Sequence, residues 1–226
     1  MDIKRFIAYY IKVVIDGDLK KMLSIAQQSQ EADARDKHAT LMHTPTLSVV
    51  TTTMSPHSAD WFYQFKSDRA RCAVPIAMTL FSVTDVMGNL LKPTINEDNR
   101  QSIEHFFDYA YGHSITTRRL TTEESGVLNG VYRNGCMHGF FPSGMNIALN
   151  LDDSEPKPLK VDEPSRLLTL NVNYLKDVVI HTINKLFADE SQHTSMQQNL
   201  DNWITKTYFS GKTKDRLDEF WSNKPY

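Results

Sequence analysis

The chain has 226 residues, of which 40% are hydrophobic and 10% aromatic, and its formal net charge is −2 at pH 7. This composition is sufficient for a sizeable core. The charge argues against a non-specific nucleic-acid coat protein, although it leaves room for a local basic groove. Two cysteines, Cys72 and Cys136, are too few for a disulfide framework or a zinc finger.

The N-terminus does not have the pattern of a signal peptide. Its apolar run from Phe6 to Ile15 is interrupted by Lys12, and no small-residue cleavage site follows. No stretch reaches the ~20 apolar residues that a membrane span needs. With so few cysteines, the simplest setting is a reducing cytoplasm, so we expect a cytoplasmic protein that does not associate with membranes.

Apolar residues recur at helical spacing from Ile3 to Val14 and predict a first helix. Asp16-Gly17-Asp18 is expected to break this helix, and Asp18 is expected to cap a second, short helix. From Gln27 to Pro56 the sequence becomes polar and is interpreted as a connecting arm. Residues 1–56 are therefore assigned to N-terminal helices and this arm.

The following block is expected to be helical. Ser58 is expected to cap a helix through Phe65. Residues 73–91 form a strongly apolar helix whose start is favoured by Pro75 and whose end is set by Pro93. This helix carries a single acid, Asp85, among apolar residues.

A further helix is predicted from about Glu97 to Tyr111. The next begins at Thr121-Thr122-Glu123-Glu124, which has the spacing of a capping box. Gly139 and Pro142 are expected to end it, so that His138 lies in its last turn.

Residues 146–151 and 167–172 are typical of β-strands and predict a small β-hairpin, 146–172, with a long, proline-rich tip. A helix from about Asn173 to Ala188 follows, and one or two more complete the chain. The expected fold is a mainly α helical bundle with a minor hairpin. Its core would span 57–190, with a C-terminal helical extension at 191–226.

The segment around Arg133, Asn134 and His138 carries the groups that cleavage of an RNA phosphodiester needs. RNA supplies its own nucleophile, the 2′-hydroxyl, so a protein has only to move protons and stabilise charge on phosphorus. His138 is suited to proton transfer, and a helix C-terminus favours its protonated form. Arg133 offers a planar cation to phosphate oxygens, and Asn134 lies on the same helical ridge as His138 and could orient its imidazole.

This pattern of an arginine, a polar residue and a histidine at the end of a helix resembles HEPN domains. The resemblance covers roughly residues 73–141, with 173–188 as a further bundle helix. It implies a metal-independent endoribonuclease with no cofactor, of the kind used in toxin or phage-defence systems. An antitoxin or another regulatory protein would then be a partner. Some toxin members carry a tyrosine two places after the histidine that a partner enzyme modifies; here this position is Phe140, so that route of control is not expected.

Geometry limits what one helix can do. Five residues at about 100° each place Arg133 and His138 about 140° apart on an ideal helix, so a single helix supplies one acid–base group at most. A symmetric homodimer would bring two copies together. HEPN ribonucleases are generally built in this way, and the resemblance implies the same here.

Two other interpretations stay open. In the first, His138 only caps helix carbonyls and Arg133 pairs with a carboxylate, for which Asp85 is the natural candidate. In the second, the chain is a non-catalytic HEPN-like module that dimerises and binds a partner or a nucleotide. A second arginine–histidine match, Arg100 to His105, lies at the start of a helix and is interpreted as surface charge.

Neighbouring residues also admit two roles. Arg118 and Arg119, just before the capping box, could contact RNA phosphate or form a solvated charge pair. Cys136 is interpreted as a packed small side chain rather than a nucleophile. Gly126, Gly130 and Gly135 favour a close approach between helices, which would suit a dimer interface. The remaining histidines show no metal-ligand spacing, and no metal is expected.

Overall fold

The structure is a computed structural model that describes residues 2–27, 68–92, 99–139, 147–151, 154–164, 166–206 and 212–222. Within these residues the chain is mainly α-helical with a small β-sheet, which confirms the predicted fold class. The predicted arm beyond Gln27 and the helix predicted at Ser58 to Phe65 lie outside the described residues.

The helical segments follow one another along the chain, and two of them have the wider π-helical winding. They are α1 (Ile3–Tyr9), the π-helical η1 (Tyr10–Leu19), α5 (Asp68–Leu91), α6 (Asn99–Gly112), α7 (Thr122–Val127), the π-helical η2 (Leu128–Arg133), α8 (Asn134–Gly139), α9 (Val172–Ala188), α10 (Glu190–Ile204) and α11 (Lys212–Ser222).

The N-terminal helix does not break where the sequence predicted. The backbone stays helical from residue 3 to residue 27, and η1 carries it through Asp16-Gly17-Asp18. Ile15 and Leu19 on either side are buried, and packing of these residues outweighs the low helix propensity of Gly17. The predicted cap at Asp18 was therefore wrong; the helix is capped by Asp2, whose side chain accepts the N–H of Lys4.

The central helix α5 is longer than predicted. It begins at Asp68, so that Pro75 lies inside the helix rather than at its start, whereas its end at Leu91 agrees with the prediction. Pro75 is exposed while Ile76 and Ala77 beside it are fully buried, and this apolar packing keeps the helix continuous past the proline.

Among the described residues, the segment 73–91 of α5 is long and apolar enough to cross a membrane by length and composition. Most of it, 61%, is buried inside the bundle. The central helix of a packed bundle has the same composition, so this property alone does not distinguish the two settings.

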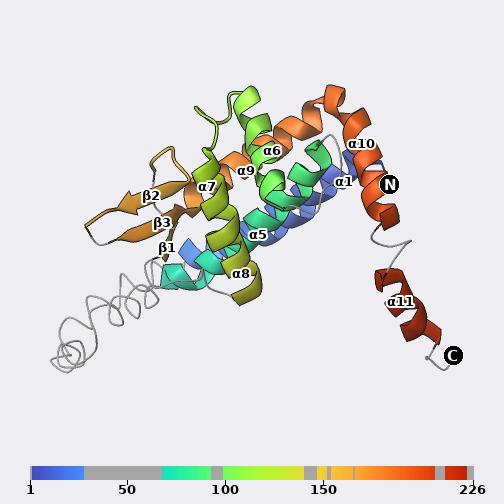
Figure 1. Cartoon of the computed structure of the whole chain (residues 1–226), viewed down its shortest axis with the longest axis horizontal. Helices are drawn as coiled ribbons and strands as arrows, with labels where there is room; N and C mark the ends of the chain where they lie inside the picture. The colour runs from blue at the N-terminus through green and yellow to red at the C-terminus, as the bar shows by residue number, and fades with distance from the viewer. Residues whose placement is uncertain are drawn as a thin grey trace.

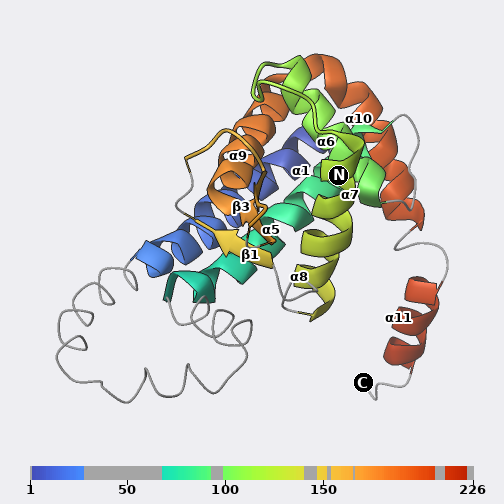
Figure 2. The same cartoon turned by 60° about the vertical axis from the view of Figure 1, so that its left-hand side comes forward.

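Helices η1, α6, α9 and α10 pack around α5, and α1 packs against α9 and α10 (Figures 1 and 2). One hydrophobic cluster includes residues from Ile3 in α1 to Leu200 in α10. The two helices are also linked directly, because the N–H of Ile3 donates to Gln197 Oε1 at 2.7 Å. The divisions after residues 56 and 190 stay predictions. Helix α11 lies apart from the bundle in both views.

A three-stranded sheet with the order β1-β3-β2 extends from one side of the bundle (Figure 1). β1 (Ile147–Asn150) pairs with β3 (Leu167–Asn171) in parallel, and β2 (Leu159–Asp162) pairs with β3 antiparallel. The predicted antiparallel pairing of the first and last strands was wrong, because the intervening segment itself contains β2. The hairpin that does occur joins β2 to β3.

Helices α5 and α6 lie close together at Gly88. A Cβ added to Gly88 would lie 1.9 Å from the carbonyl oxygen of Ser102 and 2.6 Å from its carbonyl carbon. Only a residue without a side chain fits at this crossing.

Candidate functional site

Helices α7, η2 and α8, residues 122–139, form one continuous helix that carries the sequence motif, here called the motif helix. It crosses α5 in front of the bundle (Figure 1). The predicted capping box is confirmed at its start. The Thr121 hydroxyl accepts the N–H of Glu124 at 3.1 Å, and the Glu124 carboxylate accepts the N–H of Thr121 at 2.9 Å.

Arg118 also donates two hydrogen bonds to the Glu124 carboxylate, from Nη1 at 2.7 Å and from Nη2 at 2.5 Å. The hydrogen bond from Arg118 is the main reason that the pKa of Glu124 lies below its usual value of about 4.5. The carboxylate form is therefore stabilised in the folded state, and this contribution is lost as the pH falls below the usual carboxyl range.

We expect Glu124→Gln to lower the free energy of unfolding at pH 7 by about 1 to 2 kcal/mol, because the cap and the arginine contact are both weakened. The difference from wild type should shrink as the pH falls through the usual pKa of glutamate and below it, where Glu124 itself becomes protonated. Urea unfolding at pH 7 and pH 3.5 measures both effects. Glu123→Gln is the matched control, since Glu123 is an exposed acid of the same turn. An equal loss in both variants would contradict this assignment.

The two arginines before the motif helix are both engaged with acids. Besides Glu124, Arg118 donates to the carbonyl oxygen of Arg119 at 3.0 Å. Arg119 Nε lies 3.4 Å from Asp108 Oδ1, and its guanidinium lies over the ring of Tyr111. These contacts favour the charge-pair interpretation, and binding of RNA by these arginines stays a prediction.

The motif lies where the winding of the helix changes. Arg133 is the last residue of the π-helical segment η2, and Asn134 is the first residue of α8. Short π-helical segments within α-helices are frequent at functional sites. The segment is also tied to the sheet, because the fully buried Tyr132 donates its hydroxyl to the carbonyl oxygen of Leu168 in β3 at 2.7 Å.

Arg133 is held from two helices at once. Its Nε donates to Asp85 Oδ2 on α5 at 2.8 Å, and its Nη1 donates to Asn134 Oδ1 at 2.8 Å. The Arg133 and Asp85 side chains are only 14% and 12% exposed. The acid that the sequence suggested as a partner is thus the one that Arg133 contacts.

Asp85 is in an unfavourable environment for a charge. Burial raises the pKa of its carboxyl above the usual value, and the nearby charges of Arg133 and Lys92 only partly offset this effect. Its second oxygen, Oδ1, is buried and has no hydrogen-bond partner in the described structure. The pair is therefore held by one carboxylate oxygen, while the other is desolvated without compensation.

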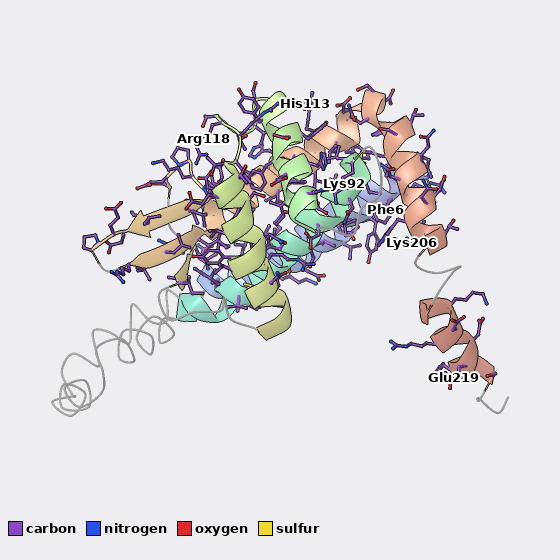
Figure 3. The ribbon with its side chains drawn as sticks, viewed as in Figure 1. Phe6, Lys92, His113, Arg118, Lys206 and Glu219 are labelled. Carbon is purple, nitrogen blue, oxygen red and sulfur yellow. The ribbon has the colours of Figure 1, made fainter. Side chains whose placement is uncertain are left out.

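A second buried cation, Lys92, directly follows the last residue of α5. Lys92 is 2% exposed and lies within the bundle (Figure 3), where its Nζ donates to Asn89 Oδ1 at 2.9 Å. At this end of α5, the side-chain amide of Asn199 donates to the backbone carbonyl oxygens of Leu90 and Lys92. This polar cluster was not found from the sequence, since its members come from distant segments.

The other motif residues are placed as follows. His138 is in the last turn of α8, as predicted, and its side chain lies outside the described atoms. Asn134 Oδ1 is occupied by Arg133, so its proposed contact with the His138 imidazole stays a prediction. Cys136 is buried, and burial raises the pKa of its thiol to about 11, which disfavours the thiolate that a nucleophile requires.

Sequence reasoning missed a cluster at the end of α6. The Tyr109 hydroxyl donates to Asp189 Oδ2 at 2.8 Å, and His113 Nε2 lies 3.3 Å from the same oxygen. The other ring nitrogen of His113 lies 3.0 Å from the Tyr109 carbonyl oxygen. Since both nitrogens face acceptors, the cluster is suited to fastening α6 to the α9–α10 junction; Figure 3 shows His113 at the upper edge of the bundle. The four-residue spacing of Tyr109 and His113 was a visible signal, but Asp189 lies 80 residues beyond Tyr109.

Across the described ranges, no group of three or more His, Cys, Asp or Glu side chains could hold a metal ion. In comparisons with known proteins, no family model, curated protein or solved structure matches this chain.

Proposed function

We propose that the protein is a metal-independent endoribonuclease that cleaves RNA by attack of the 2′-hydroxyl on the adjacent phosphate. The observation that carries this proposal is the fixed guanidinium of Arg133, five residues before His138 on the same helix. A cation held by contacts from two helices can meet developing charge without reorganising during the reaction. The pattern also resembles that of HEPN ribonucleases.

In this mechanism His138 transfers the proton and Arg133 stabilises the extra charge on phosphorus. Asn134 holds Arg133 through its side-chain oxygen and lies one helical turn before His138. Because one motif helix supplies one acid–base group, we propose that the working form is a homodimer with a composite site. Gly126 and Gly130 lie on the motif helix with open space where a Cβ would be, as a face for close helix approach requires. Use as a toxin or defence effector, with a regulatory partner, is proposed from the resemblance alone.

A second function is favoured by one observation, the Asp85–Arg133 ion pair itself. An arginine that pairs with a buried acid is also what a purely structural role would produce. In that case the chain is a non-catalytic helical module that dimerises and binds a partner or a nucleotide. The two functions predict different effects of removing His138: an enzyme would lose turnover, whereas a helical module would lose stability.

The test is cleavage of a labelled, structured RNA in excess EDTA by the wild type and by His138→Ala and Arg133→Lys. Arg133→Lys keeps a positive charge beside Asp85 but loses the planar fork. We expect cuts with 2′,3′-cyclic phosphate ends and a loss of about 100-fold or more in both variants.

His181→Ala is the matched control, because His181 is an exposed histidine on α9 whose Nδ1 contacts the carbonyl of Asp177 in its own helix. It should cut like the wild type. Equal cutting by all four proteins would exclude the motif as the catalyst. If the wild type leaves RNA intact and His138→Ala lowers the melting temperature, the helical-module function takes its place. Sedimentation of the same samples measures the expected dimer.

A further inference from the structure

We propose that Asp85 is a positioning residue for RNA cleavage, which holds Arg133 in the orientation from which it contacts the phosphate. This inference rests on the proposed function and names a residue on a second helix, outside the sequence motif, as part of the site.

The geometry fixes the guanidinium from two rigid elements. Asp85 on α5 takes the Nε edge, and Asn134 on α8 takes Nη1, each at 2.8 Å. Two contacts to different N–H groups define both the position and the plane of the fork, which one contact would not do. Many residues of α5 belong to the hydrophobic core. The contact with Asp85 therefore fixes the orientation of Arg133 relative to that core.

Stability alone does not account for an acid at this position. Asp85 is the single charged residue in the apolar stretch 73–91. Its Oδ1 is buried and has no hydrogen-bond partner among the described residues, and burial raises the pKa of its carboxyl. Replacement of a buried ion pair by apolar side chains is often neutral or stabilising, so the presence of this pair is weak evidence for a role in stability. Groups that hold a functional side chain in place do require such a contact.

The contact is compatible with phosphate binding. A guanidinium carries five N–H donors in a planar fork, and the contacts of Nε with Asp85 and of Nη1 with Asn134 use two of them, so these two contacts do not by themselves prevent a phosphate contact. The carboxylate also keeps the side chain from adopting other rotamers, and displacement of a reacting group by about 1 Å can lower a rate about 100-fold.

The test is steady-state RNA cleavage by Asp85→Asn, alone and combined with Arg133→Lys. Asparagine keeps an acceptor for Nε but removes the charge. We expect kcat to fall by about 10- to 100-fold with a smaller change in KM, because Arg133 is assigned to the transition state. Asp85→Asn should add no further loss in the Arg133→Lys background, since the two residues act through one group.

Thr84→Val is the matched control: Thr84 is also buried on α5, and its hydroxyl donates to the Leu80 carbonyl of the same helix. It should retain kcat. If Asp85→Asn does not fold, Asp85→Glu, which keeps the charge but moves it by one methylene, is expected to show the loss instead.

Wild-type cleavage by Asp85→Asn, or a multiplicative loss in the double variant, would overturn the positioning role and leave the proposed function intact. Absence of cleavage by the wild-type protein would overturn the proposed function and this inference with it.

Discussion

Gly88→Ala is expected to destabilise the protein by about 3 kcal/mol or more, because the new methyl group would collide with backbone rather than with a flexible side chain. The Cβ would lie 1.9 Å from Ser102 O, 2.6 Å from Ser102 C and 3.0 Å from Ser102 Cα. Helices α5 and α6 would have to separate, and the apolar side chains that they share would lose contact.

The measurement is the midpoint of urea unfolding followed by circular dichroism. Gly112→Ala is the matched control, because a Cβ at Gly112, the last residue of α6, meets nothing within 4 Å. Its midpoint should stay close to that of the wild type. A wild-type midpoint in Gly88→Ala would mean that α5 and α6 do not cross as closely as described.

Arg133→Met is expected to lower the free energy of unfolding at pH 7 by about 3 to 5 kcal/mol, because it leaves the Asp85 carboxylate buried without its hydrogen-bonded partner. Lys92 remains as a nearby charge but does not replace that hydrogen bond. The double variant Asp85→Leu, Arg133→Met should recover most of the loss, since it removes both charges from the interior.

The loss in Arg133→Met should also depend on pH. Burial already raises the pKa of Asp85 above its unfolded value, and removal of Arg133 raises it further. The folded state then binds the proton more tightly than the unfolded state. The penalty is therefore full above the folded pKa of Asp85 and shrinks as the pH falls through it.

Urea unfolding of wild type, single and double variants at pH 8 and pH 5 checks both statements. A single variant as stable as wild type at pH 8 would show that Asp85 finds another partner or reaches water. The Asp85–Arg133 contact would then not be what stabilises the buried carboxylate of Asp85 or holds Arg133 in place.

Local signals in the sequence were sufficient for most of the helices. The capping box at Thr121 and the end of α5 at Leu91 depend on neighbouring residues, and both agree with the structure. The break at Gly17 and the helix start at Pro75 were wrong because burial of nearby apolar residues overrode a local preference.

The sheet and the site show the limit of local reasoning. Two of the three strands could be predicted from residue type, but β2 lies in the segment that was predicted to be the hairpin tip, and the parallel pairing of β1 with β3 depends on where β2 packs. The contact between Asp85 and Arg133 could be suggested because a lone acid in an apolar helix requires a partner. The spacing of Tyr109 and His113 was a local signal, but no local pattern marks Asp189 as their partner or Asn199 as the residue that bonds the end of α5, because both lie in distant segments.

The contact between the first helix and α10 has a consequence for synthesis of the chain. Ile3 bonds a residue 194 positions later, and the buried Met196 and Leu200 belong to the same cluster as Phe6 and Ile7. On the ribosome the core therefore cannot close until the segment around residue 200 has emerged. Until then part of the apolar surface of α1 and α5 is uncovered, which is the period when a nascent chain is most prone to aggregate and to engage chaperones.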